Sequence, residues 1–104
     1  MLNQIVLVGR ISSDLKLEKL ENGVKYNEFK LAVPRNFNNE DGEYETDFIP
    51  IRTFKDVAKS IVDCCKVGDV IGVKGRLQIE DEKLVIAVEK ISFLSTSKNE
   101  GDED

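Results

Sequence analysis

The chain has 104 residues, 40% hydrophobic and 34% charged, which is enough for one domain with a single core. Its net charge is −5, and the last seven residues, KNEGDED, carry −3 of it. No run approaches the roughly 18 apolar residues of a membrane span. The N-terminus also lacks a basic, apolar leader, so we expect a cytoplasmic protein without a membrane partner.

The residue types argue against catalysis. The sequence has no His, no Gly-rich phosphate loop and no nucleophile with an identifiable base. The carboxylates cluster without the spacing of a calcium loop, and two adjacent cysteines make a poor metal site. We therefore expect no enzyme activity, no catalytic residues, no metal and no cofactor.

The first half of the chain predicts three strands, at residues 3–11, 24–33 and 44–54. Gly9 interrupts the first strand and indicates a bend, which would let that strand pair with two neighbours. A weaker apolar run at 15–20 ends at Asn22-Gly23, the dipeptide typical of tight hairpins. Pro50 indicates that the third strand is an edge or is bulged there.

A helix follows the third strand. Apolar residues recur at helical spacing, at Val57, Ala58, Ile61, Val62 and Cys65. Thr53 and Asp56 resemble a capping box, and Gly68 supplies a stop. The pattern predicts a helix over 55–66.

Two more strands, at 70–79 and 84–94, complete the domain. We predict an all-β protein with one helix, a five-stranded OB-fold barrel with the helix between strands 3 and 4. An open α+β sheet would show the same pattern. The domain covers 1–95, and 96–104 is predicted to be a short acidic disordered tail.

The segment DFIPIRTF, at 47–54, points to a binding surface. Alternation in a strand places Phe48, Arg52 and Phe54 on the face opposite Ile49 and Ile51. The alternative is that both rings are partly buried, with Phe54 simply starting the apolar stripe of the helix.

Several cations and one more ring are expected near this face. They are Lys74 and Arg76 on the fourth strand, Arg10 after the Gly9 bend, and Arg35 and Phe37 in the loop after the second strand. Rings stack on bases and cations follow phosphates, so the set suits single-stranded nucleic acid. A protein-binding face would also use exposed Phe but would gain less from unpaired Lys and Arg.

These segments resemble the bacterial or phage-type single-stranded DNA-binding protein (SSB) family. The resemblance rests on NQIVLVGRI, NGVKYNEFKLAVPRNF, DFIPIRTFKDVA and VGDVIGVKGRLQ, in that order, and with the last strand it covers about residues 1–94. It implies sequence-independent binding and protection of single-stranded DNA in replication, recombination and repair. It also implies a homo-oligomer, usually a homotetramer, that works with replication and recombination proteins at the nucleoid, or in the host cytoplasm for a phage protein.

The resemblance assigns base stacking to Phe37, Phe48 and Phe54, with phosphate contacts from Arg10, Arg35, Arg52, Lys74 and Arg76. The sequence departs from the family at the last hairpin, where Glu80-Asp81-Glu82 replace an aromatic residue and basic residues. The acidic end also lacks the apolar cap of bacterial relatives, as in a truncated chain or a phage or mobile-element version. An OB-fold module that binds RNA, or a protein-interaction subunit, remains the alternative.

Overall fold

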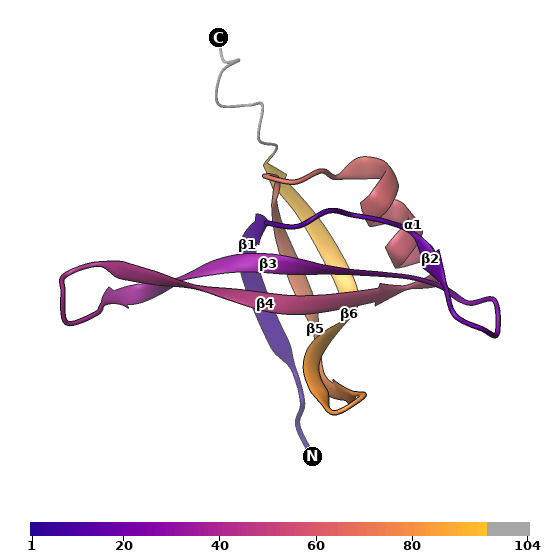
Figure 1. The fold of residues 1–104 in the computed structure, drawn as a ribbon, viewed down its shortest axis with the longest axis horizontal. Coiled ribbons are helices and arrows are strands. Elements are labelled where there is room, and N and C mark those ends of the chain that lie inside the picture. The colour runs from indigo at the N-terminus through magenta and orange to yellow at the C-terminus, as the bar shows by residue number, and fades with distance from the viewer. Residues whose placement is uncertain (96–104) are drawn as a thin grey trace, which may run out of the picture.

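The computed structural model describes residues 1–95, and the predicted tail at 96–104 lies outside them. The elements, in chain order, are β1 (Ile5–Ile11), β2 (Glu18–Lys19), β3 (Lys25–Asn38), β4 (Tyr44–Phe54), α1 (Lys55–Cys64), β5 (Val70–Glu80) and β6 (Lys83–Ser95). In Figure 1, β3 and β4 run horizontally across β1, β5 and β6.

The sheet closes into a barrel of five long strands. The hydrogen-bonded order is β1-β5-β6-β4-β3, and a further β1–β3 pairing joins the two ends. All pairings are antiparallel except β4–β6, which is parallel and covers Ile51 and Arg52 on β4. The predicted closed barrel is therefore confirmed, and the open α+β sheet is wrong.

The two-residue β2 changes only how the strands are counted. It pairs only with the start of β3 and is not one of the strands that close the barrel. The helix therefore lies between β4 and β5, which are the third and fourth long strands of the prediction.

Gly9 has the role that the sequence predicts. β1 pairs with β5 through Ile5–Arg10 and then with β3 at Arg10 and Ile11. A Cβ at Gly9 would lie 2.6 Å from the carbonyl oxygen of Ala32 on β3. Only a residue without a side chain permits this approach, which closes the barrel.

The core lies inside the barrel and under the helix. It consists of Ile11, Phe29, Leu31, Ile51, Ile61, Ile71, Val73 and Ile86. These residues come from β1, β3, β4, α1, β5 and β6, so the alternating pattern of each strand points one face inward. Their burial is the main source of stability for the domain.

The helix is two residues shorter than predicted. It ends at Cys64, and Cys65 leaves it with extended backbone. The expected capping box does not form, because Phe54 occupies the N-cap position without a side-chain hydrogen bond. The Thr53 hydroxyl is buried and instead donates to the carbonyl oxygen of Asn27, at 3.5 Å.

Pro50 sits where the sequence expects a strand edge. It pairs with Lys30 of β3 on one side, and the β4–β6 pairing starts one residue later, at Ile51. Proline therefore occupies a position that needs no donor toward β6. In the part of the chain that the structure covers, no helix has the length and hydrophobicity to cross a membrane.

Candidate nucleic-acid interface

Phe48 stands on the outer face of β4, as the alternation predicts. Its side chain is 61% exposed, whereas Ile51 on the opposite face is fully buried. Its partner across the sheet is the small Ala32 of β3, so no neighbouring side chain covers the ring from that strand. Most of the Phe48 side chain is therefore exposed to solvent.

Phe54 is only half-buried, and it has two roles. It lies on the same face as Phe48, opposite Tyr26 of β3, and it is also the N-cap residue of α1. The alternative of partial burial is thus correct for Phe54 and incorrect for Phe48. Tyr26, which the sequence did not single out, adds an aromatic ring to this end of the surface.

Arg52 lies between Phe48 and Phe54 but is held by the protein. Its guanidinium is 3.3 Å from a carboxylate oxygen of Glu28 and 3.4 Å from one of Glu80, and it stacks over Tyr26 at 5.7 Å. The side chain is 17% exposed, and its buried Nε has no hydrogen-bond partner among the described residues. A phosphate would have to compete with two carboxylates for this cation.

Arg35 is also paired with acids. Its Nη2 lies 2.9 Å from Asp47 and its Nη1 lies 3.1 Å from Glu45. The hydrogen bond between Arg35 and Asp47, followed by their charges, raises the pKa of the guanidinium and lowers the pKa of the carboxyl. The guanidinium therefore already has two carboxylate partners in the free protein.

Phe37 lies beyond Arg35, on the part of the β3–β4 hairpin that projects from the barrel at the left of Figure 1. We call residues 33–47 the acidic arm, because they contain one Arg and five carboxylates. Phe37 is as exposed as Phe48. Its surroundings are negative, whereas those of Phe48 are apolar.

The other three predicted cations lie on β1 and β5. The Nη1 of Arg10 donates to the carbonyl oxygen of Gly68 at 2.7 Å, and the Nη1 of Arg76 lies 3.2 Å from Glu89. Lys74 stands directly across from Lys90 of β6 and borders a separate hollow of about 340 Å³. The sequence predicted that these cations lie near the face of Phe48, whereas Lys74 borders a different hollow from Phe48, so the predicted cations do not share one surface.

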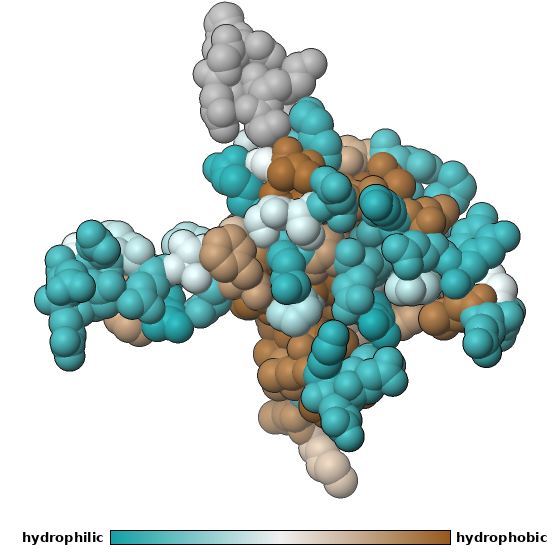
Figure 2. All heavy atoms as spheres, in the orientation of Figure 1, coloured by the Kyte–Doolittle hydropathy of each residue, from teal (hydrophilic) through white to brown (hydrophobic). Residues whose placement is uncertain are grey.

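Next to Phe48 lies an apolar hollow of about 410 Å³, which the sequence did not predict. We call it the Phe48 hollow. Its walls are Phe48, Ile49 and Pro50 of β4, Leu77 of β5, Leu84, Val85 and Ile86 of β6, and Ile5 and Leu7 of β1, with Asp47 at its margin. Figure 2 shows hydrophobic surface gathered in this part of the molecule, below the β3–β4 ribbon and beside the β5–β6 hairpin.

A second hollow of about 450 Å³ adjoins the first and shares Pro50 and Val85 with it. We call it the lysine hollow, because Lys30 and Lys83 line it. Neither ammonium group has an ion-pair partner within residues 1–95. The alternation of the strand placed Lys30 on the outer face in the sequence. Lys83 was not recognised as a candidate, because it directly follows the acidic residues Glu80, Asp81 and Glu82.

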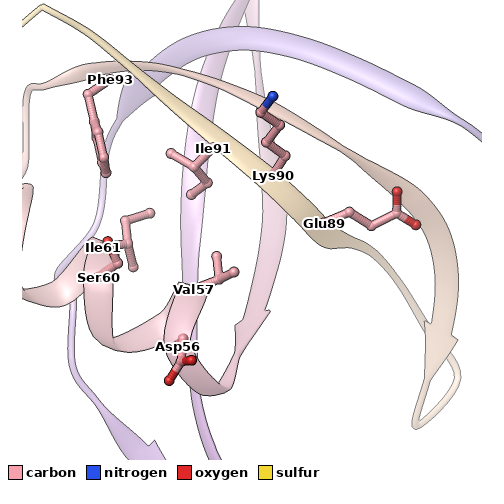
Figure 3. Close-up of a pocket in the computed structure, with 8 residues that line it drawn as sticks. All are labelled: Asp56, Val57, Ser60, Ile61, Glu89, Lys90, Ile91 and Phe93. Carbon is pink, nitrogen blue, oxygen red and sulfur yellow. The ribbon is translucent and has the colours of Figure 1, made fainter.

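A hollow of about 370 Å³ between α1 and β6 is different in character (Figure 3). Phe93 and Ile91 point toward the helix there, whereas the Lys90 ammonium points away from it. Asp56 and Glu89 are also part of its lining. With two carboxylates and its cation turned outward, this groove does not suit a polyanion.

The described residues contain no group of His, Cys, Asp and Glu that could hold a metal ion. Cys64 and Cys65 are free thiols. Burial, followed by the charges of Asp69 and Cys64, raises the pKa of Cys65 to about 11, so this thiol stays protonated near neutral pH.

Comparison with known proteins gives a consistent result. The model of the single-strand binding protein family matches residues 2–93. A single-stranded DNA-binding protein of Oceanobacillus iheyensis is 35% identical over the whole chain, which spans 70% of that relative. Single-stranded DNA-binding protein 2 of Staphylococcus aureus is 46% identical, and single-stranded DNA-binding protein A of Bacillus subtilis is 45% identical; each match covers 75% of this chain.

The matches span 56% and 45% of those two relatives, so the chain corresponds to about half of their length. Among solved structures, the small single-stranded DNA-binding protein of Streptomyces coelicolor superposes with a TM-score of 0.73 and 24% identity. That similarity covers 89% of this chain and 94% of the other, and it shows a shared fold.

Proposed function

Because this chain belongs to the single-strand binding protein family, we propose that it binds single-stranded DNA with little sequence preference and without catalysing a reaction. The observation that carries the proposal is the exposed ring of Phe48 in the wall of the Phe48 hollow. This hollow adjoins the lysine hollow, whose Lys30 and Lys83 have no ion-pair partner in the described part of the chain. Stacking is worth about 1–3 kcal/mol per base and does not depend on base identity.

In this proposal the three phenylalanine rings differ in how strongly they stack on bases. Phe48 stacks one base, and Phe54, which is partly covered, offers a smaller area to a second base. Phe37 would stack a base that reaches the acidic arm. Repulsion from the surrounding carboxylates makes this the weakest of the three contacts.

The cations fall into two groups. Lys30, Lys83 and Lys74 have no ion-pair partner in the described part of the chain. Lys30 and Lys83 can meet phosphates directly, whereas Lys74 lies beside Val6 and can do so only where an assembly leaves it uncovered. The arginines at 10, 35, 52 and 76 already donate to protein oxygens. They would contribute when a phosphate replaces or joins those partners, which lowers the gain per contact.

We further propose that the protein assembles as a homo-oligomer, with a tetramer as the specific expectation. β1 has β5 on one side along Ile5–Arg10, but β3 joins its other side only at Arg10 and Ile11. The remaining edge and the exposed Val6 and Val8 form a surface that a second copy can cover. Several joined barrels would lengthen the DNA path.

The biological setting of the proposal is replication, recombination and repair, in contact with other proteins of those processes. It places the protein in the cytoplasm at the nucleoid, or in the host cytoplasm if a phage encodes it. The relatives that match are longer than this chain, so these activities are proposed for the chain by analogy.

The test is a fluorescence titration that uses the tyrosines as the probe, with oligo-dT, RNA and duplex DNA of equal length at two ionic strengths. We expect oligo-dT to bind most tightly, and its affinity to fall as salt rises because phosphates release counterions. Preference for duplex, or affinity that does not change with salt, would contradict the proposal. Mass measured in parallel gives the number of chains.

A further inference from the structure

Building on the proposed binding of single-stranded DNA, we propose that the Phe48 hollow is a subsite for a pyrimidine with a 5-methyl group. The protein would then bind thymine more tightly than uracil at this position. The hollow holds about 410 Å³, within the range of small-ligand sites, which is about 300–1,000 Å³. It opens beside the ring on which the neighbouring base would stack.

The walls of the hollow decide which group of a base they can distinguish. Leu77 and Leu84 of the β5–β6 hairpin line it together with Phe48 and Pro50 of β4, and both leucines keep exposed surface. These side chains offer neither donors nor acceptors. They can make favourable contacts with an apolar substituent of a base, but they cannot form hydrogen bonds with the polar edge of the base.

The polar inventory supports the same conclusion. Among the described residues, the one polar side chain that lines the hollow is Asp47. Arg35 already engages both of its carboxylate oxygens, at 2.9 and 3.1 Å. The 5-methyl of thymine is the apolar group that distinguishes this base from uracil and cytosine.

The adjoining lysine hollow gives the strand a direction across the surface. It shares Pro50 and Val85 with the Phe48 hollow and presents Lys30 and Lys83, which have no ion-pair partner within residues 1–95. Glu28 also lines it, but its carboxylate is paired with Arg52. A base in the Phe48 hollow therefore has cations next to it for its backbone. This alternation of an apolar recess and positive charge fits a nucleotide better than it fits an apolar peptide.

The experiment compares oligo-dT with oligo-dU of about eight nucleotides, a length suited to one OB unit. The two differ only in the 5-methyl groups. Burial of one methyl predicts that the wild-type protein binds oligo-dT about fourfold more tightly. The variants Leu77→Ala and Leu84→Ala remove walls of the hollow, and we expect each to reduce the ratio toward one.

Leu20→Ala is the matched control. Leu20 is 39% exposed and Leu77 is 40% exposed, so the same substitution removes a comparable apolar side chain. Leu20 lies near the β2–β3 turn and lines none of the hollows described above. This variant should keep the wild-type ratio of dT to dU affinity. Oligonucleotides of 5-methylcytosine and cytosine should behave in the same way: the wild-type protein and Leu20→Ala should prefer the methylated base, and Leu77→Ala and Leu84→Ala should lose this preference.

The outcomes separate the two proposals. Equal affinity for dT and dU in the wild-type protein, or a preference that Leu77→Ala and Leu84→Ala leave intact, would overturn the methyl subsite while single-stranded DNA binding stands. A change in assembly mass with an unchanged ratio would assign the hollow to a second copy of the chain and also overturn it. Failure of every oligonucleotide to bind would remove the proposed function itself.

Discussion

Two hairpins extend from the same barrel, and they differ in whether their basic side chains are already paired with carboxylates. The acidic arm, 33–47, carries Phe37 and Tyr44 in the open, but its one arginine is clamped by Asp47 and Glu45. The β5–β6 hairpin, 76–87, exposes leucine and isoleucine side chains and carries Lys83 without an ion-pair partner within residues 1–95. Both hairpins expose apolar side chains, but of the two only the β5–β6 hairpin also carries, among the described residues, a cation without an ion-pair partner, Lys83.

The difference shows that residue type alone does not make a nucleic-acid contact. Arg35 and Lys83 are both basic and both lie on hairpins. One is neutralised by two carboxylates at hydrogen-bonding distance, whereas the other borders the lysine hollow. The partners of a cation therefore decide whether a phosphate gains from meeting it.

The largest expected effect concerns how each hairpin is built. Gly75 lies where the β5–β6 register shifts, and a Cβ there would collide with the carbonyl oxygen of Ala87. Gly75→Ala should lower the free energy of unfolding by about 3 kcal/mol. Gly42→Ala, at the open tip of the acidic arm with φ of +82°, should cost only about 1 kcal/mol. Urea denaturation measures both, and equal losses would contradict the distinction.

Next come the two exposed rings. Phe48→Ala should weaken oligo-dT binding by about 2–3 kcal/mol, near the upper end for one stacked base. Phe37→Ala should cost about 1 kcal/mol or less, because Phe37 lies on the acidic arm. Titration at one fixed salt concentration compares them, with thermal unfolding as the control for folding. A larger loss at Phe37 would make the acidic arm the principal contact.

The cations should differ in how salt affects binding. Lys83→Gln should reduce the slope of log affinity against log salt by about 0.7, the value for one phosphate on a single strand. Arg35→Gln should change the slope less, because Asp47 and Glu45 already neutralise the guanidinium. Titrations at several salt concentrations give the slopes. A larger change in slope for Arg35→Gln than for Lys83→Gln would show that DNA readily displaces Asp47 and Glu45 from Arg35.

The smallest effect is a pKa change within the acidic arm. Arg35 lowers the pKa of Asp47 below its ordinary value of 3.8. The stabilisation from this pair is thus present above pH 3.8 and is lost as pH falls through the lower folded-state pKa. Arg35→Gln should return the pKa of Asp47 toward 3.8, as measured by NMR titration of its carboxyl carbon. An unchanged pKa would mean that Arg35 does not set it.

The sequence was sufficient for the five long strands, the helix and the outward position of Phe48. Each follows from local periodicity, because alternation fixes the face of a strand residue and the i, i+3, i+4 spacing fixes the stripe of α1. Gly9 and Pro50 were also informative, since each marks a place where the backbone departs from regular pairing.

The site depended on contacts between segments far apart in the chain. Arg52 meets Glu28 and Glu80, which are 24 and 28 positions away, so its neutralisation could not be read from the segment 47–54. The Phe48 hollow likewise forms only where β1, β4 and the β5–β6 hairpin converge. The capping box was wrongly predicted for a related reason, because the Thr53 hydroxyl donates to the carbonyl oxygen of Asn27 on β3 and not to the start of the helix.

Arg52 has one more consequence, which is mechanical. Its guanidinium bridges Glu28 on β3 and Glu80 near the tip of the β5–β6 hairpin, so a single side chain latches that hairpin to the sheet. The β5–β6 register also shifts between Lys74 and Gly75, just before this hairpin. Any phosphate that takes Arg52 from Glu80 therefore also removes an ion pair between the sheet and this hairpin.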